Sequence, residues 1–242
     1  MMDHAKLGSN QPYTADEVYK KIRRSIIKLE LEPGQRISEN QMTQIYGVSR
    51  SVIRTAFTRL RQIRFIEIYP QRGTYVSLID LNHIADLLML RTAVEKEVIY
   101  EVFTSLKDEV RAALVKALEE NLQEQEKCRD EPDYNGRFPR IDSAFHKTMI
   151  DSVGRYALVE MLSDDMLHIA RWRNFDVAFD HRIPDLIEQH RAIVDAIKAE
   201  DMLLAQKKMA DHLETISNIA DRAKAKFPSY FNGLSDRPAG TR

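Results

Sequence analysis

The sequence predicts a mainly α-helical fold, in which an N-terminal winged helix-turn-helix precedes an all-α helical bundle. Two observations predict it. Residues 39–76 run from a short helix through a glycine turn into a second helix and then two short strands. From Leu81 onward, apolar residues recur almost continuously at helical spacing. A chain of 242 residues is long enough to bury a core in each part.

We expect four segments and a cytoplasmic protein. Residues 1–12 lack the apolar segment of a signal peptide and are predicted to be a disordered tail. Residues 13–78 form the winged helix-turn-helix, residues 79–228 the helical domain and residues 229–242 a C-terminal tail. The single cysteine excludes an internal disulfide and fits a reducing cytosol. No apolar run approaches the length of a membrane span.

The first helix is predicted over residues 15–29, where apolar residues recur at helical spacing. Thr14, with Glu17 three residues later, has the pattern of a capping box. The Glu-Pro-Gly stretch at residues 32–34 then forces a turn. Residues 36–38 are expected to form a short strand that joins the wing.

The helix-turn-helix itself is predicted from residue 39 to residue 63. Residues 39–46 supply a short first helix, and Gly47 stands where the turn needs a residue that accepts positive φ. Ser49 is expected to cap the second helix, residues 50–63, with its side chain. The wing follows as two short strands at residues 65–69 and 74–76.

Six helices are predicted in the second part, because turn-forming residues such as Pro132, Gly136, Gly154 and Pro184 interrupt the helical pattern. The predicted helices span residues 82–104, 107–129, 140–152, 156–172, 184–199 and 202–226.

The charges divide unevenly between the two parts. Residues 1–78 hold 13 Lys and Arg against 7 Asp and Glu, whereas residues 79–242 hold 23 against 30. A basic module on an acidic body is typical of a protein in which only one end meets a polyanion. Together with the helix-turn-helix pattern, this predicts that residues 13–78 bind double-stranded DNA.

Two arginines open the second helix of the motif, the end that points into the major groove. Arg50 and Arg54 lie one turn apart, and arginine can bond bidentately to guanine O6 and N7. We predict that both read bases or phosphates. The alternative is a solvated basic face, which we favour for Arg59, Arg61 and Arg64.

Other residues near this helix are expected to contact phosphates rather than bases. Gly73 is predicted to let the wing backbone approach the minor groove closely. The expected phosphate contacts are Thr43, Ser49, Ser51 and Arg72.

Polar residues interrupt the apolar faces of three helices in the second part. Asp142 and His146 are four residues apart beside one apolar stripe, while His190 and His212 each lie within another. Burying such groups without partners is costly, and one shared divalent metal relieves that cost. Oxygen and imidazole ligands suit zinc, our first expectation, or nickel, cobalt or manganese. The alternative is that each is a satisfied core residue, and the residues alone leave both interpretations open.

A further charged pair lies on the apolar stripe of residues 82–104. Arg91 and Glu95 are four residues apart. They are either an internal ion pair, which we favour slightly, or part of an effector site in which Arg91 holds a carboxylate. A second candidate cluster for the effector consists of Arg171, Trp172 and Arg173, although Trp172 is expected instead to pack in a helix interface.

Three stretches resemble the GntR family of bacterial transcription regulators, in the branch with an FCD-type helical domain. They are LEPGQRISE at residues 31–39, GVSRSVIR at residues 47–54 and RGTYV at residues 72–76. Val52 stands where the family usually has proline, and Arg64 stands near a common glycine, so the turn there is expected to differ.

The resemblance implies a homodimeric regulator that reads a pseudo-palindromic operator and responds to a small organic acid. It also implies a DNA contact at Asn40. Many similar helical domains carry an aspartate and three histidines in the order D-x-x-x-H, H, H, which matches Asp142, His146, His190 and His212.

Two other functions remain open. A metal-dependent enzyme fused to a DNA-binding module would need a metal with an open position to activate water. The sequence shows no clear general base, nucleophile motif or phosphate-binding loop, so we predict no catalytic residues. An architectural DNA-binding protein would not need four polar groups on core stripes. We therefore predict an effector-controlled transcriptional regulator, as a repressor.

Overall fold

The computed structural model describes residues 13–131, 136–180, 182–214 and 220–232, without the side chains of residues 176–180. The chain divides into two compact units, Met1–Leu78 and Ile79–Arg242. We call the described part of the first the N-terminal unit and that of the second the helical unit. The two expected terminal tails lie largely outside the described residues. Among the described helices, none is both long and apolar enough to cross a membrane.

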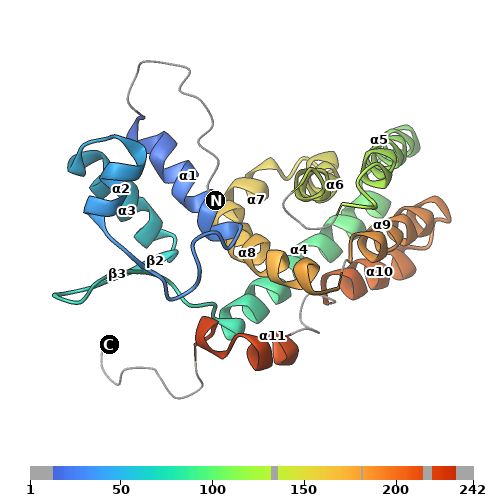
Figure 1. Cartoon of the computed structure of the whole chain (residues 1–242). Helices are drawn as coiled ribbons and strands as arrows, with labels where there is room; N and C mark the ends of the chain where they lie inside the picture. The colour runs from blue at the N-terminus through green and yellow to red at the C-terminus, as the bar shows by residue number, and fades with distance from the viewer. Residues whose placement is uncertain (1–12, 132–135, 181, 215–219, 233–242) are drawn as a thin grey trace, which may run out of the picture. The chain divides into compact units, whose positions relative to one another are not determined.

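The N-terminal unit is a three-helix cluster with a three-stranded antiparallel sheet, in the strand order β1-β3-β2 (Figure 1). Its core forms where α1 packs on α3, through residues such as Ile22, Ile26, Phe57 and Leu60. The elements are α1 (Ala15–Ile27), β1 (Arg36–Ile37), α2 (Glu39–Tyr46), α3 (Arg50–Gln62), β2 (Ile66–Tyr69) and β3 (Gly73–Val76).

Local signals position these elements as the sequence predicts. Thr14 and Glu17 form the complete capping box at the start of α1. Gly47 ends α2 in the left-handed region, at φ 64°. Arg64 also has a positive φ, 57°, in the turn between α3 and β2. The turn therefore keeps a left-handed backbone where glycine is absent, at a conformational cost that glycine would avoid.

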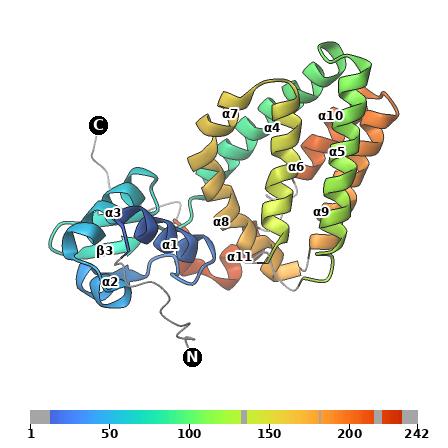
Figure 2. The same ribbon diagram turned by 90° about the horizontal axis from the view of Figure 1, so that it is seen from above.

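The helical unit is a ring of five packed helices, because α4 contacts α10, α10 contacts α9, α9 contacts α5, α5 contacts α6 and α6 contacts α4. Figure 2 shows α5, α6 and α9 side by side. The elements are α4 (Leu81–Thr104), α5 (Asp108–Glu126), α6 (Phe138–Ser152), α7 (Tyr156–Met161), α8 (Ser163–Asp180), α9 (Ile183–Lys198), α10 (Met202–Glu214), α11 (Ala220–Lys226) and the 3-10 helix η1 (Pro228–Tyr230).

One predicted helix of the helical unit is divided. The expected helix at residues 156–172 is broken at Leu162 into α7 and α8. The Ser163 hydroxyl donates to the carbonyl of Glu160 at this point, a bond that competes with the helical ladder. Helix α8 also runs past the expected end, because its buried face continues from Trp172 to Phe175. The predicted packing role of Trp172 agrees with its contacts to Phe175 and Phe231.

The last described residues hydrogen-bond to Ile79, the first residue of the helical unit. The Ile79 amide donates to the carbonyl of Tyr230 at 2.8 Å, and the Asn232 amide donates to that of Ile79 at 3.3 Å. Residues 229–232, which we assigned to a tail, are thus part of the fold, and residues 233–242 lie outside the described part. The predicted helix at 202–226 is described as α10 and α11, with residues 215–219 between them not described.

Candidate metal centre and nucleic-acid interface

Four polar side chains from three helices meet inside the helical unit. Asp142 and His146 come from α6, His190 from α9 and His212 from α10, and all four are at least 96% buried. One donor atom from each lies within 4.8 Å of the other three. The amphipathic pattern of each helix turns these residues inward, since α6 and α9 place them in line with core residues such as Phe145.

The three imidazoles face one another through their Nε2 atoms. The Nε2 of His212 is 3.2 Å from that of His190 and 3.3 Å from that of His146. The Nε2 of His190 is 3.7 Å from an Asp142 oxygen. The donor atoms therefore surround one point.

The opposite nitrogen of each ring is held by an oxygen atom. His146 Nδ1 lies 2.5 Å from a Glu95 carboxylate oxygen. His190 Nδ1 lies 2.8 Å from the Gln125 amide oxygen, and His212 Nδ1 lies 2.9 Å from that of Gln189. These oxygens accept hydrogen bonds, so each ring donates from Nδ1 and presents an Nε2 lone pair. Three lone pairs and a carboxylate around one point fit a divalent cation, and the outer hydrogen bonds are typical of metal-binding histidines.

Burial keeps the three imidazoles neutral. Desolvation lowers the pKa of His190 to about 3, and it also lowers the pKa of His146 and of His212 below the ordinary value. Burial alone would raise the pKa of Asp142, but Arg173 above all holds it well below its usual range. The site thus offers neutral nitrogen ligands and an ionised oxygen ligand, the forms that bind metal.

Two buried ion pairs border the cluster. Arg91 Nε lies 2.6 Å from Glu95, and Arg173 Nη1 lies 2.5 Å from Asp142. Burial would raise the pKa of Glu95, but His146 and Arg91 lower it to about 2. Two cations and two anions cancel, so a bound divalent ion would leave the centre with excess positive charge.

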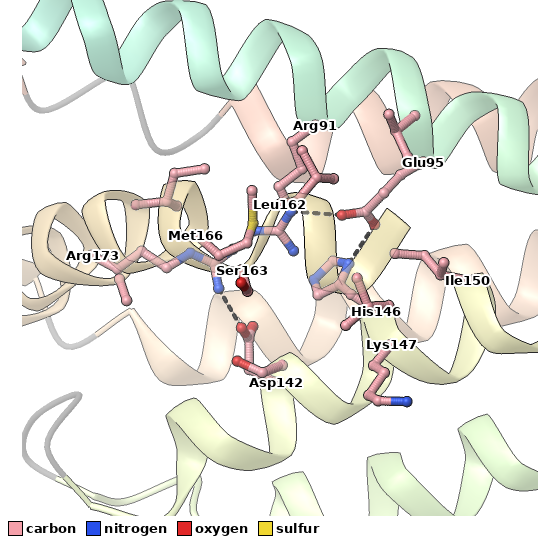
Figure 3. A pocket seen from close by; sticks show the side chains of 15 residues that line it. Arg91, Glu95, Asp142, His146, Lys147, Ile150, Leu162, Ser163, Met166 and Arg173 are labelled. Carbon is pink, nitrogen blue, oxygen red and sulfur yellow. Dashed lines mark hydrogen bonds and ion pairs between the residues drawn. The ribbon is translucent and has the colours of Figure 1, made fainter. Parts of the chain in front are cut away.

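A cavity of about 240 Å³ opens onto this centre (Figure 3). Both arginines, Asp142 and His146 line it, as do Ser143, Lys147 and Ser163. Much of the remaining wall is apolar, formed by side chains that include Val94, Ile150, Val159, Leu162, Met166 and Ile169. Such a cavity suits a ligand with an anionic group at one end and a carbon skeleton at the other.

The sequence prediction missed part of this centre. It placed Arg173 with Arg171 and Trp172 in a second candidate cluster and did not predict the ion pair between Arg173 and Asp142. Gln125 has a detectable signal, because it continues the buried stripe of Leu118 and Leu122 along α5 as a polar residue. His83 and His168, which the prediction left out, contact each other instead, with ring centroids 5.2 Å apart.

The predicted DNA-reading residues lie at the start of α3 and on α2. Arg50 and Arg54 are exposed, and Arg54 Nε lies 3.0 Å from both carboxylate oxygens of Glu39. Asn40 is also exposed, and it accepts at its carbonyl a hydrogen bond from the half-buried Thr43 hydroxyl at 2.7 Å. Because Arg54 is bonded to Glu39, that ion pair must break before Arg54 can contact a base.

Two details of this face differ from the sequence prediction. Ser49 stands at the N-cap position, but its hydroxyl bonds the Ser51 hydroxyl at 2.8 Å and makes no cap bond. Arg59 is only partly solvated: it donates to Asp16 at 2.8 Å and lies over the Tyr19 ring at 3.9 Å. Its half-buried position ties α3 to α1.

The wing presents Arg72 in the turn between β2 and β3, and Gly73 at the start of β3. Arg72 is exposed, and its carbonyl accepts a hydrogen bond from the Tyr75 hydroxyl at 3.1 Å. Gly73 has φ +116°, and a Cβ there would lie 3.0 Å from Arg36 Nε. Both the backbone conformation and the close neighbour favour glycine.

Two family models match this chain. Residues 14–76 match bacterial regulatory proteins of the gntR family, and residues 86–215 match the FCD domain. An uncharacterized HTH-type transcriptional regulator in an unstable DNA locus of Streptomyces ambofaciens is 30% identical over 216 residues, or 89% of this chain and 88% of that protein.

Two further proteins are similar over almost the whole chain. The HTH-type transcriptional repressor RspR of Escherichia coli K12 is 25% identical over 234 residues, or 96% of this chain and 99% of the repressor. The solved structure of E. coli McbR/YncC has a TM-score of 0.62 at 18% identity, and the match covers 88% of this chain and 98% of that one. At that identity the structural likeness supports the fold alone.

Proposed function

Because the chain belongs to the GntR family of bacterial transcriptional regulators, with an FCD domain behind its DNA-binding module, we propose that it is an operator-binding repressor controlled by a small organic acid. The acid binds beside a divalent metal ion held by Asp142, His146, His190 and His212. The similarity to RspR, which is described as a repressor, supports repression rather than activation.

The convergence of three imidazole Nε2 atoms carries this proposal. Neutral rings whose lone pairs face one another at 3.2 and 3.3 Å repel, and a cation between them would relieve that repulsion at all three rings, whereas Arg173 Nη2 lies 3.5 Å from the Nε2 of His212. A bound divalent ion supplies that positive charge, together with coordination positions for an oxygen ligand. Asp142 provides the anionic member of the set, and Arg173 keeps it ionised.

The cavity supports an acid as the effector. Arg91 and Arg173 enter it from α4 and α8, and both can donate to a carboxylate. Its wall at Ile150, Leu162 and Met166 offers contacts to a carbon skeleton but no charge. A cavity with arginines on one part of its wall and apolar side chains on another suits a short acid with an apolar portion. It suits a sugar acid less well, because such an acid carries hydroxyls along its length.

The exposed arginines at the start of α3 support DNA reading by the N-terminal unit. We assign Arg50 and Arg54 to base edges, because they lie at the start of the recognition helix. We assign Arg72 and Gly73, on the wing, to positions beside the DNA backbone. We further propose a homodimer that reads two half-sites. A change in the spacing of the two modules would then change operator affinity.

One described contact lies between the C-terminal residues and the start of the helical unit. Tyr230, in η1, accepts a hydrogen bond from Ile79, and we propose that this contact takes part in the coupling. Ile79 is the first residue of the helical unit, directly after the DNA-binding module. The effector can shift the regulator only by its different affinity for the two arrangements, usually a factor of about 5–150.

The test measures operator affinity of the zinc-loaded full-length protein with and without a panel of short carboxylic acids. We expect at least one acid to change affinity about 5–150-fold without being consumed, and His190→Ala to lose that response while its ligand-free DNA binding persists. His83→Ala, which removes a histidine of the same unit outside the centre and the cavity, is the matched control for general disturbance. Turnover of the acid would favour a metal-dependent enzyme, and a full response in His190→Ala would refute the link between metal and operator.

A further inference from the structure

A chain of two amides, half-buried Asn121 and buried Gln125, joins α6 to one histidine of the centre through α5. Gln125 is fully buried, on the same face of α5 as Leu118 and Leu122. Its Nε2 donates to Asn121 Oδ1 at 2.7 Å, while its Oε1 is 2.8 Å from His190 Nδ1. Asn121 Nδ2 in turn donates to the backbone carbonyl of Ile141 at 3.0 Å.

The carbonyl at the end of this chain fixes the direction of every bond in it. A backbone carbonyl only accepts, so Asn121 must turn its NH₂ group toward Ile141 and its oxygen toward Gln125. Gln125 must then turn its own NH₂ toward Asn121 and its oxygen toward the ring. The ring must therefore carry its hydrogen on Nδ1, since any reversal would bring two acceptors or two donors face to face.

We propose that Asn121 and Gln125 are positioning residues that set the tautomer of His190. They hold the Nδ1–H form, so that the Nε2 lone pair points to the shared centre, 3.2 Å from His212 Nε2. The Ile141 carbonyl oxygen, which fixes the direction of these hydrogen bonds, belongs to the residue directly before Asp142. A ligand on α9 is thus aligned by the backbone of the helix that carries two of the other ligands.

The other two histidines are held differently. His146 faces the carboxylate of Glu95, which accepts whichever way it turns. His212 faces Gln189, and among the described residues no further bond sets which way the Gln189 amide turns. Among the three rings, His190 is the one whose tautomer depends on a directed chain of two amides. Loss of this chain should therefore affect metal binding through one identifiable ring.

The test compares Gln125→Met with Leu122→Met in full-length protein. Methionine keeps the length of glutamine but accepts no strong hydrogen bond, whereas Leu122→Met alters the same buried stripe without touching the chain. By competition with a chelator, zinc affinity should fall about 10–100-fold in Gln125→Met, the usual effect of removing an outer partner, and stay within about twofold in Leu122→Met. Asn121→Leu should give a smaller loss, because Gln125 remains but can turn over.

Nitrogen NMR of the histidine rings in metal-free protein gives the readout that packing alone would not move. We expect His190 to carry its hydrogen on Nδ1 in the parent and to gain the Nε2–H form in Gln125→Met. An Nε2–H ring in the parent, or parental zinc affinity in Gln125→Met, would overturn the inference. If Gln125→Met does not fold, the parent spectrum and Asn121→Leu decide. The inference rests on the proposed metal site, yet a parent that binds no zinc refutes that site separately from the tautomer result.

Discussion

The two units place their functional side chains in opposite environments. In the N-terminal unit Arg50, Arg54 and Arg72 are exposed, so water stabilises their charges in the absence of DNA. In the helical unit Asp142 and His190 are buried with their partners, so each ligand is also a component of the core. A residue of the first kind can be changed without cost to folding, whereas a residue of the second kind cannot. Function and stability are separable in one unit and coupled in the other.

The largest expected effect follows from removing a buried ionic partner. Asp142→Ala removes the carboxylate that lies 2.5 Å from the buried Arg173, and metal-free protein should lose about 3–5 kcal/mol of stability. Trp172 is the single tryptophan in the sequence and is buried in the helical unit, so its fluorescence follows this unfolding in urea.

Glu39→Ala is the matched control in the other unit. It removes the carboxylate beside Arg54, whose side chain is 66% exposed, and should cost at most about 1 kcal/mol. Hydrogen exchange of the α3 amides measures the stability of the N-terminal unit. Equal losses in the two variants would show that burial does not distinguish the units.

A pH series should sharpen the same contrast. The folded helical unit keeps His190 neutral down to a pKa of about 3, whereas an unfolded histidine titrates near 6.5. Between those values the unfolded chain binds more protons, so stability is present above about pH 6.5 and falls as the pH falls. Each such histidine contributes up to about 1.4 kcal/mol per pH unit.

Urea midpoints of metal-free protein, followed through Trp172 from pH 7 to pH 5, measure this slope. His190→Gln should reduce the slope, because glutamine takes up no proton in either state. A parent midpoint that does not change between pH 7 and pH 5 would contradict the assignment of buried neutral imidazoles.

On the exposed side, substitution should change binding and leave folding alone. Arg50→Ala should weaken specific operator binding by about 1–3 kcal/mol if the contact is bidentate to a base. Arg54→Ala should cost less, because Arg54 first leaves Glu39, a surface pair worth at most about 1 kcal/mol. Fluorescence anisotropy with a selected operator at fixed salt measures both.

Arg59→Ala tests the boundary of that reading face. Arg59 lies on α3 like the other two, but it is engaged by Asp16 and Tyr19. We expect it to affect the stability of the N-terminal unit more than its DNA affinity. Parental operator affinity in both Arg50→Ala and Arg54→Ala would mean that another face of α3 reads DNA.

Local signals explain why much of the N-terminal unit could be predicted. The Thr14 capping box and the Gly47 turn depend on residues only a few positions apart, and they form as expected. The candidate centre could be predicted for another reason. Polar residues such as His190 on apolar stripes are costly without partners, so their shared position follows from three separate helix patterns.

The remaining features depend on atoms far apart in the sequence. Arg173 lies at the centre because α8 extends past its expected end. The end of a helix is set by its packing as well as by its sequence. Gln125 binds His190 across 65 residues, a distance over which no spacing rule operates. The Ser49 hydroxyl bonds the Ser51 hydroxyl instead of accepting from a backbone amide of α3, and these two alternatives differ too little in energy for the sequence to decide.

The smallest expected effect concerns a position where the N-terminal unit departs from the family pattern. Arg64 occupies the left-handed region at φ 57° directly after α3. A residue with a Cβ is disfavoured there, whereas glycine is favoured but loses more entropy on folding. Arg64→Gly should therefore stabilise the unit by about 0.5–1 kcal/mol, measured by hydrogen exchange of α3 amides. Arg61→Gly, inside the helix, should destabilise it by about 1 kcal/mol. Since both changes remove one exposed arginine, opposite signs would isolate the backbone effect, and equal signs would show that lost charge dominates.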